Sequence, residues 1–335
     1  MRLMDQIAQA NEPFFAPDPD GGKTLSLPCS NALAPTLQSC PVRYILHDDI
    51  VETCIKIGFE PEGILQIAAD LLRCPARRLW VEFNGAARNR AYGEKDRLAG
   101  DAARSSNQRL GLLIESDASG RKGTIQSCWE SAQGPSPEMA PFVAEFDFDH
   151  AAIKNYSESG VSGRSRASCV EVRINDFPAL ENLFRYFCFR FRPEWHDYYQ
   201  RRCESQTQYE DIVQAALKPV VEDVPFFAAL MLLLMAHNAV KPSYVTLAKL
   251  NASRAKRGKT ALLDHVELTL ELGGTDEQWA VGRQGHNRAV SRLHAVRGHL
   301  VRRGDMIFWR KTHLRGSAAL GVTANRTISV RFAAE

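Results

Sequence analysis

The chain has 335 residues, of which 44% are hydrophobic and 24% are charged, and its net charge at pH 7 is +3. This is a globular composition with room for one large domain or two, and so small a net charge indicates no partner by itself. The most apolar run, 225–236, is much shorter than the roughly 20 residues of a membrane-spanning helix. We therefore expect a buried core helix there and no membrane partner.

Eight cysteines are spread over the chain, and none forms a C-x-x-C pair. The N-terminus carries an early acid, Asp5, and lacks the apolar core of a signal peptide. These features favour a cytoplasmic protein whose cysteines are reduced and serve as small buried residues.

The first half of the chain carries mainly strand patterns. Residues 1–40 are rich in Pro, Gly, Asp and Ser, which predicts an extended arm with little helix. A helix is expected from Asp48 to Gly58, and the polar stretch 84–108 is expected to be a long loop. Alternating apolar residues predict strands at 78–83, 110–115, 124–130, 143–148 and 169–174. We expect 41–175 to form an α+β domain with a mostly antiparallel sheet.

Helical periodicity dominates the next segment. Apolar residues from Leu180 to Phe191 recur at helical spacing, and Pro193 ends this pattern. Further helices are expected at 207–219, 225–240 and 244–256, the last followed by Gly258 as a stop signal. These patterns predict a helical region over 176–260.

The last segment, 261–335, is expected to be a basic β-rich segment that packs on the helical region. A strand is predicted at 261–272 and another at 327–332. Between them, 290–303 and 306–314 are expected to form a β-hairpin around Gly304 and Asp305. The predicted fold class is therefore α+β, with antiparallel sheet first, helices in the middle and a C-terminal basic β-hairpin.

Positive charge is concentrated near the C-terminus. Residues 281–331 contain eleven Lys and Arg against one carboxylate, Asp305, which gives this segment a net charge of +10. Since Glu335 contributes −1, residues 1–280 sum to −6. A basic end on an acidic body suggests a polyanionic partner, although an arginine-rich solvated sheet face would have the same composition.

The hairpin register determines which of these side chains can act together. A two-residue turn at Gly304 and Asp305 pairs Arg303 with Met306, and hence Leu300 with Trp309. Alternation then divides the side chains between two faces. One face receives His294, Arg302, Trp309, Lys311, His313 and Arg315, and the other receives Arg297, His299, Val301, Phe308, Arg310 and Leu314. A bulge at Gly298 would exchange the faces of the residues before it.

Arginine binds phosphate through two parallel hydrogen bonds, and histidine exchanges a proton near neutral pH. Together they suit the binding of a phosphodiester or its cleavage without a metal. The candidate catalytic residues are His294, His299 and His313. The candidate ligand-binding residues are Arg297, Arg302, Arg303, Trp309, Arg310, Lys311 and Arg315, with Trp309 as a stacking surface for a base.

Each candidate also has a purely structural interpretation. The histidines can serve local hydrogen bonding, and Trp309 beside Leu300 is typical of a core residue. We expect no metal site, because no carboxylate or cysteine accompanies the histidines and the arginines would repel a cation. We expect no cofactor, because the glycines at 21–22 lack the P-loop pattern.

Several motifs resemble a family of uncharacterised proteins of tailed phages and prophages. They are the stretch 249–263, the H-x-x-R-G-H motif at 294–299 and the H-x-R-G motif at 313–316, together with the strand at 74–83. The resemblance covers the C-terminal third well and the middle thinly. It implies a phage or prophage setting, hence the cytoplasm of a bacterial host cell, and no particular catalytic activity.

Three functions remain open from the sequence. The first is a phage-type accessory protein that binds nucleic acid or another polyphosphate through the basic hairpin. The second is a metal-independent ribonuclease that uses the same His/Arg cluster. The third is a non-enzymatic assembly factor that binds a host or phage protein. Whether the protein is an enzyme is not decided by these patterns.

Overall fold

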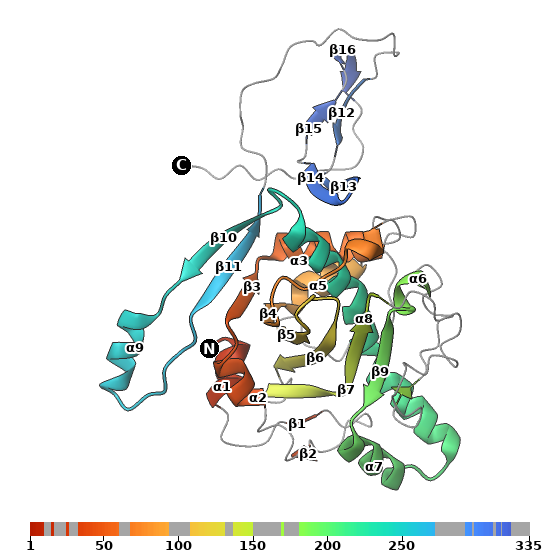
Figure 1. Ribbon diagram of the computed structural model, residues 1–335, viewed down its shortest axis with the longest axis vertical. Coiled ribbons are helices and arrows are strands. Elements are labelled where there is room, and N and C mark those ends of the chain that lie inside the picture. Colours follow the sequence, from red (N-terminus) through yellow and green to blue (C-terminus); the bar gives the residue numbers. More distant parts are fainter. Residues whose placement is uncertain are drawn as a thin grey trace. The chain divides into compact units, whose positions relative to one another are not determined.

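The computed structural model is shown in Figure 1. It describes residues 1–9, 15–16, 25–26, 33–59, 68–93, 108–130, 137–149, 169–170, 181–271, 292–296, 298–310, 313–315 and 317–322. Contacts divide the chain into two compact units. Unit 1 comprises Met1–Met235 and Val240–Leu270, and unit 2 comprises Ala236–Ala239 and Glu271–Glu335. The expected separate domains at 41–175 and 176–260 are thus parts of one unit, because they contribute strands to one sheet.

Unit 1 is built on a nine-stranded mixed sheet with the order β10-β11-β3-β4-β5-β6-β7-β9-β8. β11 pairs with β3, and β3 with β4, in parallel, whereas the other neighbours are antiparallel. The strands are β3 (Val42–Leu46), β4 (Arg78–Asn84), β5 (Arg109–Ser116), β6 (Lys122–Glu130), β7 (Pro137–Asp147), β8 (Cys169–Val170), β9 (Phe187–Phe191), β10 (Val240–Val245) and β11 (His265–Leu270). The prediction of an α+β fold is confirmed, and the sheet is mixed, with two parallel pairs among mostly antiparallel neighbours.

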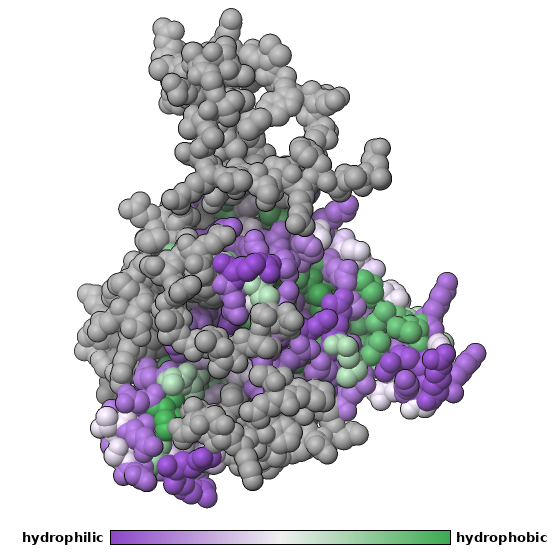
Figure 2. All heavy atoms as spheres, turned by 180° about the vertical axis from the view of Figure 1, so that it is seen from behind, coloured by the Kyte–Doolittle hydropathy of each residue, from purple (hydrophilic) through white to green (hydrophobic). Residues whose placement is uncertain are grey.

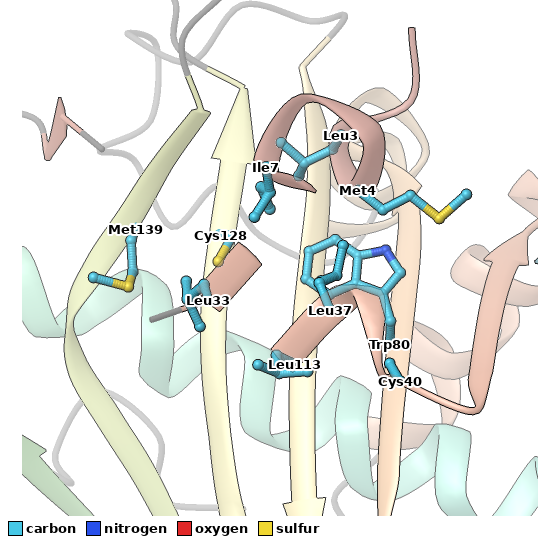
Figure 3. Close-up of a cluster of buried hydrophobic side chains, with 10 residues drawn as sticks. All are labelled: Leu3, Met4, Ile7, Leu33, Leu37, Cys40, Trp80, Leu113, Cys128 and Met139. Atoms are coloured by element: carbon cyan, nitrogen blue, oxygen red, sulfur yellow. The ribbon is translucent and has the colours of Figure 1, made fainter. Parts of the chain in front are cut away.

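Helices cover both faces of this sheet. Figure 3 shows two short N-terminal helices in front of the strands and the long helix α8 behind them. The helices of unit 1 are α1 (Leu3–Gln9), α2 (Leu33–Gln38), α3 (Asp48–Gly58), α5 (Gly85–Gly93), α6 (Glu181–Phe184), α7 (Pro193–Arg202), α8 (Gln206–Met235) and α9 (Ala248–Ala255). A short 3-10 turn spans Ala69–Leu71, and β1 (Phe15–Ala16) pairs with β2 (Leu25–Ser26).

The expectation of an extended N-terminal arm is wrong for α1 and α2. Their apolar residues pack on one face of the sheet against Trp80, Leu113, Cys128 and Met139 (Figure 3). The start of α1 is held by the buried Glu82 carboxylate. It accepts hydrogen bonds from the backbone N–H groups of Leu3 and Met4, each at 3.0 Å. A carboxylate at a helix N-terminus satisfies donors that the helix itself cannot.

The opposite face is covered chiefly by α8, where two helices were expected. Pro219 and Pro225 lie inside one continuous 30-residue helix. Burial outweighs the cost of an internal proline, about 3 kcal/mol, because every residue from Val220 to Leu233 is buried. The expectation of a buried core helix at 225–236 is confirmed for 225–233. No helix in the described part of the chain is both long and apolar enough to cross a membrane.

A buried polar cluster joins α5 and α8 to the sheet. Arg88 Nη1 donates to Asp223 Oδ1 at 2.7 Å, and Ser127 Oγ donates to Asp223 Oδ2 at 2.7 Å. The Arg88 side chain is 1% exposed and that of Asp223 is 8% exposed. The loop expected over 84–108 is therefore wrong at 85–93, because a helix there buries its arginine against a carboxylate.

Three further expectations fail locally. The aromatic stripe after Leu180 is a short helix followed by β9, in which Phe187, Phe189 and Phe191 alternate with other residues as in any strand. The strand expected at 143–148 begins earlier, since β7 starts at Pro137. The helix expected at 244–256 begins only at Ala248, after β10. The strand expected at 327–332 lies outside the described residues.

Unit 2 is a set of short strands: β12 (Arg292–Val296), β13 (His299–Arg303), β14 (Met306–Arg310), β15 (His313–Arg315) and β16 (Ser317–Val322). β13 pairs with β14, and β12 lies between β15 and β16. The boundary expected at 261 falls instead after Leu270, because β11 belongs to the large sheet of unit 1.

We expect Asp223→Ala to lower the free energy of unfolding by about 3–5 kcal/mol, since it leaves the Arg88 charge buried without this partner. Ser127→Ala should cost about 2 kcal/mol, because it removes one hydrogen bond to a charged group. Urea denaturation followed by circular dichroism measures both. Glu210→Ala, at an exposed position of the same helix, is the control and should stay within about 0.5 kcal/mol. Equal stabilities for Asp223→Ala and Glu210→Ala would contradict a stabilising cluster.

Candidate anion-binding surfaces

The β13–β14 hairpin of unit 2 has the register expected from its turn. Arg303 pairs with Met306, Leu300 with Trp309 and His299 with Arg310. Gly304 has φ +59°, the left-handed conformation that the first turn residue of a two-residue hairpin needs and that glycine adopts freely. The conformation of Gly304 in the turn therefore sets the residue pairing of the whole β13–β14 hairpin.

The same count continues beyond Gly298 without a shift. β12 pairs with β15 so that His294 lies opposite Arg315 and Val296 opposite His313. No extra residue is inserted between these pairs and the β13–β14 pairs, so Gly298 does not displace the register as a bulge would. The glycine has another role: a Cβ atom there would lie 2.5 Å from the Trp309 ring. The indole packs directly over the Gly298 backbone.

The two faces of the hairpin differ in exposure. Leu300 is 7% exposed, Ile307 3% and Trp309 9%. Of the two interpretations of Trp309, a stacking surface for a base or a core residue, its burial supports the core residue. Arg302, on the same face, folds back so that its Nε donates to the Gly304 carbonyl at 2.8 Å.

The other face carries exposed cations. His299, Arg303 and Arg310 are all exposed, and their register positions put them on one side of the hairpin. In the described part of the chain no ion pair involves Arg303 or Arg310. Within the described residues of unit 2, this open face can meet an anion.

Sequence reasoning missed a histidine at the margin of this face. His237, just beyond α8, forms a parallel bridge with Phe308. Its backbone N–H donates to the Ile307 carbonyl at 3.2 Å, and its ring stacks on Phe308 with centroids 5.6 Å apart. His237 is exposed, so the pair adds an aromatic surface to the hairpin face. Its position at the end of an apolar helix gave no local signal of this pairing.

Other sequence candidates cannot be placed on a face. Arg297 and Lys311 lie outside the described residues. The backbones of His294, His313 and Arg315 are placed in strands, whereas their side chains are outside the described part. The structure therefore brings together His299, Arg303 and Arg310, and adds His237.

A second basic surface lies in unit 1, on the arm formed by β10, α9 and β11 (Figure 1). Between 240 and 264 the chain has six Lys and Arg against one carboxylate, Asp264, a net charge of +5. Lys249, Lys256, Arg257 and Lys259 are all exposed. α9, the helix expected at 244–256, buries none of its residues.

Cysteine and metal chemistry find little support in the described residues. Burial raises the pKa of the Cys74 and Cys128 thiols to about 12, so both stay protonated and poorly nucleophilic near neutral pH. Cys188 is disulfide-bonded, so the expectation of reduced cysteines is wrong at this position. Within the described residues, no three His, Cys, Asp or Glu side chains are grouped to hold a metal ion.

Comparison of the chain with family models, curated proteins and solved structures found no match. The function of the protein is therefore inferred from the geometry and charge of the β13–β14 hairpin face and of the arm of β10, α9 and β11.

We expect Gly298→Ala to destabilise the β13–β14 hairpin by about 1–3 kcal/mol, because the added methyl group overlaps the Trp309 ring. Hydrogen exchange of the amides in 299–310, read by mass spectrometry, should become faster in this variant. Combining it with Trp309→Phe should cost less than the sum of the two single changes, since the smaller ring leaves space for the methyl group. Unchanged exchange in Gly298→Ala would contradict the close packing.

Proposed function

We propose that this protein binds nucleic acid or another polyphosphate through the exposed face of the β13–β14 hairpin. The observation that carries the proposal is the placement of His299, Arg303 and Arg310 together on that face. Two guanidinium groups with adjacent imidazoles supply donors of the geometry that phosphate oxygens accept. The stacked His237–Phe308 pair offers an aromatic surface beside them.

The spacing of the described histidines favours binding over cleavage. His237 lies opposite Phe308, and His299 lies opposite Arg310 on the far strand. Two strand spacings and two residues along the strand put their Cα atoms about 12 Å apart. That distance is wide for two imidazoles to serve one phosphate as acid and base, where each must come within hydrogen-bonding reach.

The setting belongs to the same proposal. From the resemblance of 294–299 and 313–316 to proteins of tailed phages and prophages, we infer that the binding takes place in the cytoplasm of a bacterial host. The thiols of Cys40, Cys54, Cys74 and Cys128 agree with a reducing compartment, and the disulfide at Cys188 is the observation against it.

We expect Arg303→Glu combined with Arg310→Glu to weaken binding of a fluorescent single-stranded oligonucleotide by tenfold or more. The slope of log affinity against log salt should fall by about 1.4, since each phosphate contact on a single strand contributes about 0.7. Fluorescence anisotropy over a salt series measures both. The double change to Lys, which keeps the charge, should retain most of the salt slope.

The control reverses the same charges elsewhere: Arg201→Glu with Arg202→Glu, at the exposed end of α7. It should leave affinity and slope unchanged. If the control and the hairpin variant lose affinity equally, the binding reflects net charge and not this face. If the native protein binds no nucleic acid or polyphosphate at any salt concentration and instead captures one stoichiometric protein, the assembly-factor alternative is supported.

The ribonuclease alternative makes a different prediction for the same protein and RNA. RNA incubated with the protein and a chelator should remain intact if the hairpin only binds. Cleavage with a bell-shaped pH profile that is lost in a folded His299→Ala variant would establish the alternative and displace binding as the primary function.

A further inference from the structure

The arm of β10, α9 and β11 carries one exposed aromatic side chain beside its cations. Tyr244 in β10 is 80% exposed. It pairs with Val266 of β11, which in turn pairs with Tyr44 of β3, so the three residues form a row across one face of the sheet. Burial, and then the negative charge of the neighbouring Tyr244 phenolate, raise the pKa of the Tyr44 phenol. Tyrosines on an open sheet face present the flat surface on which an unpaired base stacks.

The cations lie at the same end of the arm. Tyr244 is the penultimate residue of β10, and α9 follows two residues after that strand. Lys249 lies on α9, and Lys256 and Arg257 follow its last turn, all of them exposed. Figure 2 shows hydrophilic side chains at the tip of the arm, at the right of the view. A phosphate backbone that runs past the tyrosine row therefore meets several positive charges.

Side-chain hydrogen bonds hold α9 in place without a core. Asn251 Nδ2 donates to the Leu262 carbonyl at 2.9 Å, and Asn251 Oδ1 accepts from the Leu262 N–H at 2.8 Å. Arg254 Nε donates to the Thr260 carbonyl at 2.8 Å. An isolated helix of this length would be unstable in water. These hydrogen bonds keep a cationic helix without buried residues ordered, as a preorganised binding surface requires.

The edge of the sheet disfavours a second strand as the occupant. β10 is the outermost strand at its end of the described sheet. Pro242 lacks a backbone donor, and Lys241 beside it is exposed, two devices that prevent pairing between edge strands. The net charge of +5 over 240–264 also repels another copy of the same arm.

We propose that the arm is a binding surface for single-stranded nucleic acid, in which Tyr244 stacks on a base while Lys249, Lys256 and Arg257 contact phosphates. This site lies in unit 1 and goes beyond the hairpin site of unit 2. The partner follows from two independent features. The charge selects a polyanion, and the exposed Tyr244 ring selects one with unpaired aromatic bases over a duplex, a polysaccharide or a lipid surface.

The test uses the full chain and three probes: a labelled thymidine oligonucleotide of about 20 nucleotides, a duplex of the same length, and phosphatidylserine vesicles. Tyr244→Ala should weaken oligonucleotide binding about tenfold, the value of one stacked base. It should leave duplex binding unchanged, and Tyr244→Phe should bind as the native protein does. Lys256→Glu with Arg257→Glu should weaken oligonucleotide binding at least tenfold and reduce its salt slope by about 1.4.

The α7 pair Arg201→Glu and Arg202→Glu again serves as the matched control and should bind normally. Thermal unfolding of all variants checks folding. Tyr244 and the two cations are exposed, so little change is expected.

Three results would overturn the proposal. One is native affinity and salt slope in the Lys256→Glu, Arg257→Glu variant. Another is unchanged oligonucleotide binding in Tyr244→Ala. The third is loss of vesicle binding without loss of oligonucleotide binding, which would assign the arm to a membrane surface. The hairpin variant in the same assay separates the two sites: loss only there refutes the arm, and loss only in the arm variants refutes the hairpin.

Discussion

From Val220 to Leu233, α8 buries every residue against the rest of unit 1. Each fully buried large apolar side chain there stabilises the fold by about 2–3 kcal/mol. The ring centroid of Phe227, for example, lies 5.3 Å from that of Phe146 and 6.3 Å from that of Phe187. Both candidate surfaces begin where this helix ends. The chain passes directly from α8 to His237, which pairs with the hairpin, and then to β10, the first strand of the arm.

The charge on the surface of the protein differs from the net charge summed along the sequence. Several carboxylates of unit 1 are internal: Glu82 holds the start of α1 and Asp223 pairs with Arg88. The cations of the arm and the hairpin face are exposed. The value of −6 for residues 1–280 thus conceals a surface of +5 at 240–264. Net charge over a long segment says little about partners when one sign is buried and the other is exposed.

The parts of the structure that local chemistry determines could be predicted. The turn glycine at 304, with φ +59°, set the register of the β13–β14 hairpin. Elements that depend on distant partners could not. α5 looks like a polar loop because its buried Arg88 is satisfied by Asp223, 135 residues away. β9 was missed because Phe184, Phe187 and Phe191 fit a helical spacing, whereas Phe187, Phe189 and Phe191 alternate as in a strand.

The binding surfaces likewise contain residues that the sequence could predict and residues that it could not. The sequence pointed to Arg303, Arg310 and His299 through their density of charge. It could not reveal the row of Tyr44, Val266 and Tyr244, because Tyr44 and Tyr244 come to one sheet face only through the parallel pairing of β3 with β11. The most direct test is photocrosslinking of the native protein to a bromouracil-substituted single strand, followed by peptide mapping. The account predicts crosslinks within 240–270 and 299–310 that disappear as salt rises. Crosslinks confined to other regions of the chain, or none at low salt, would contradict it.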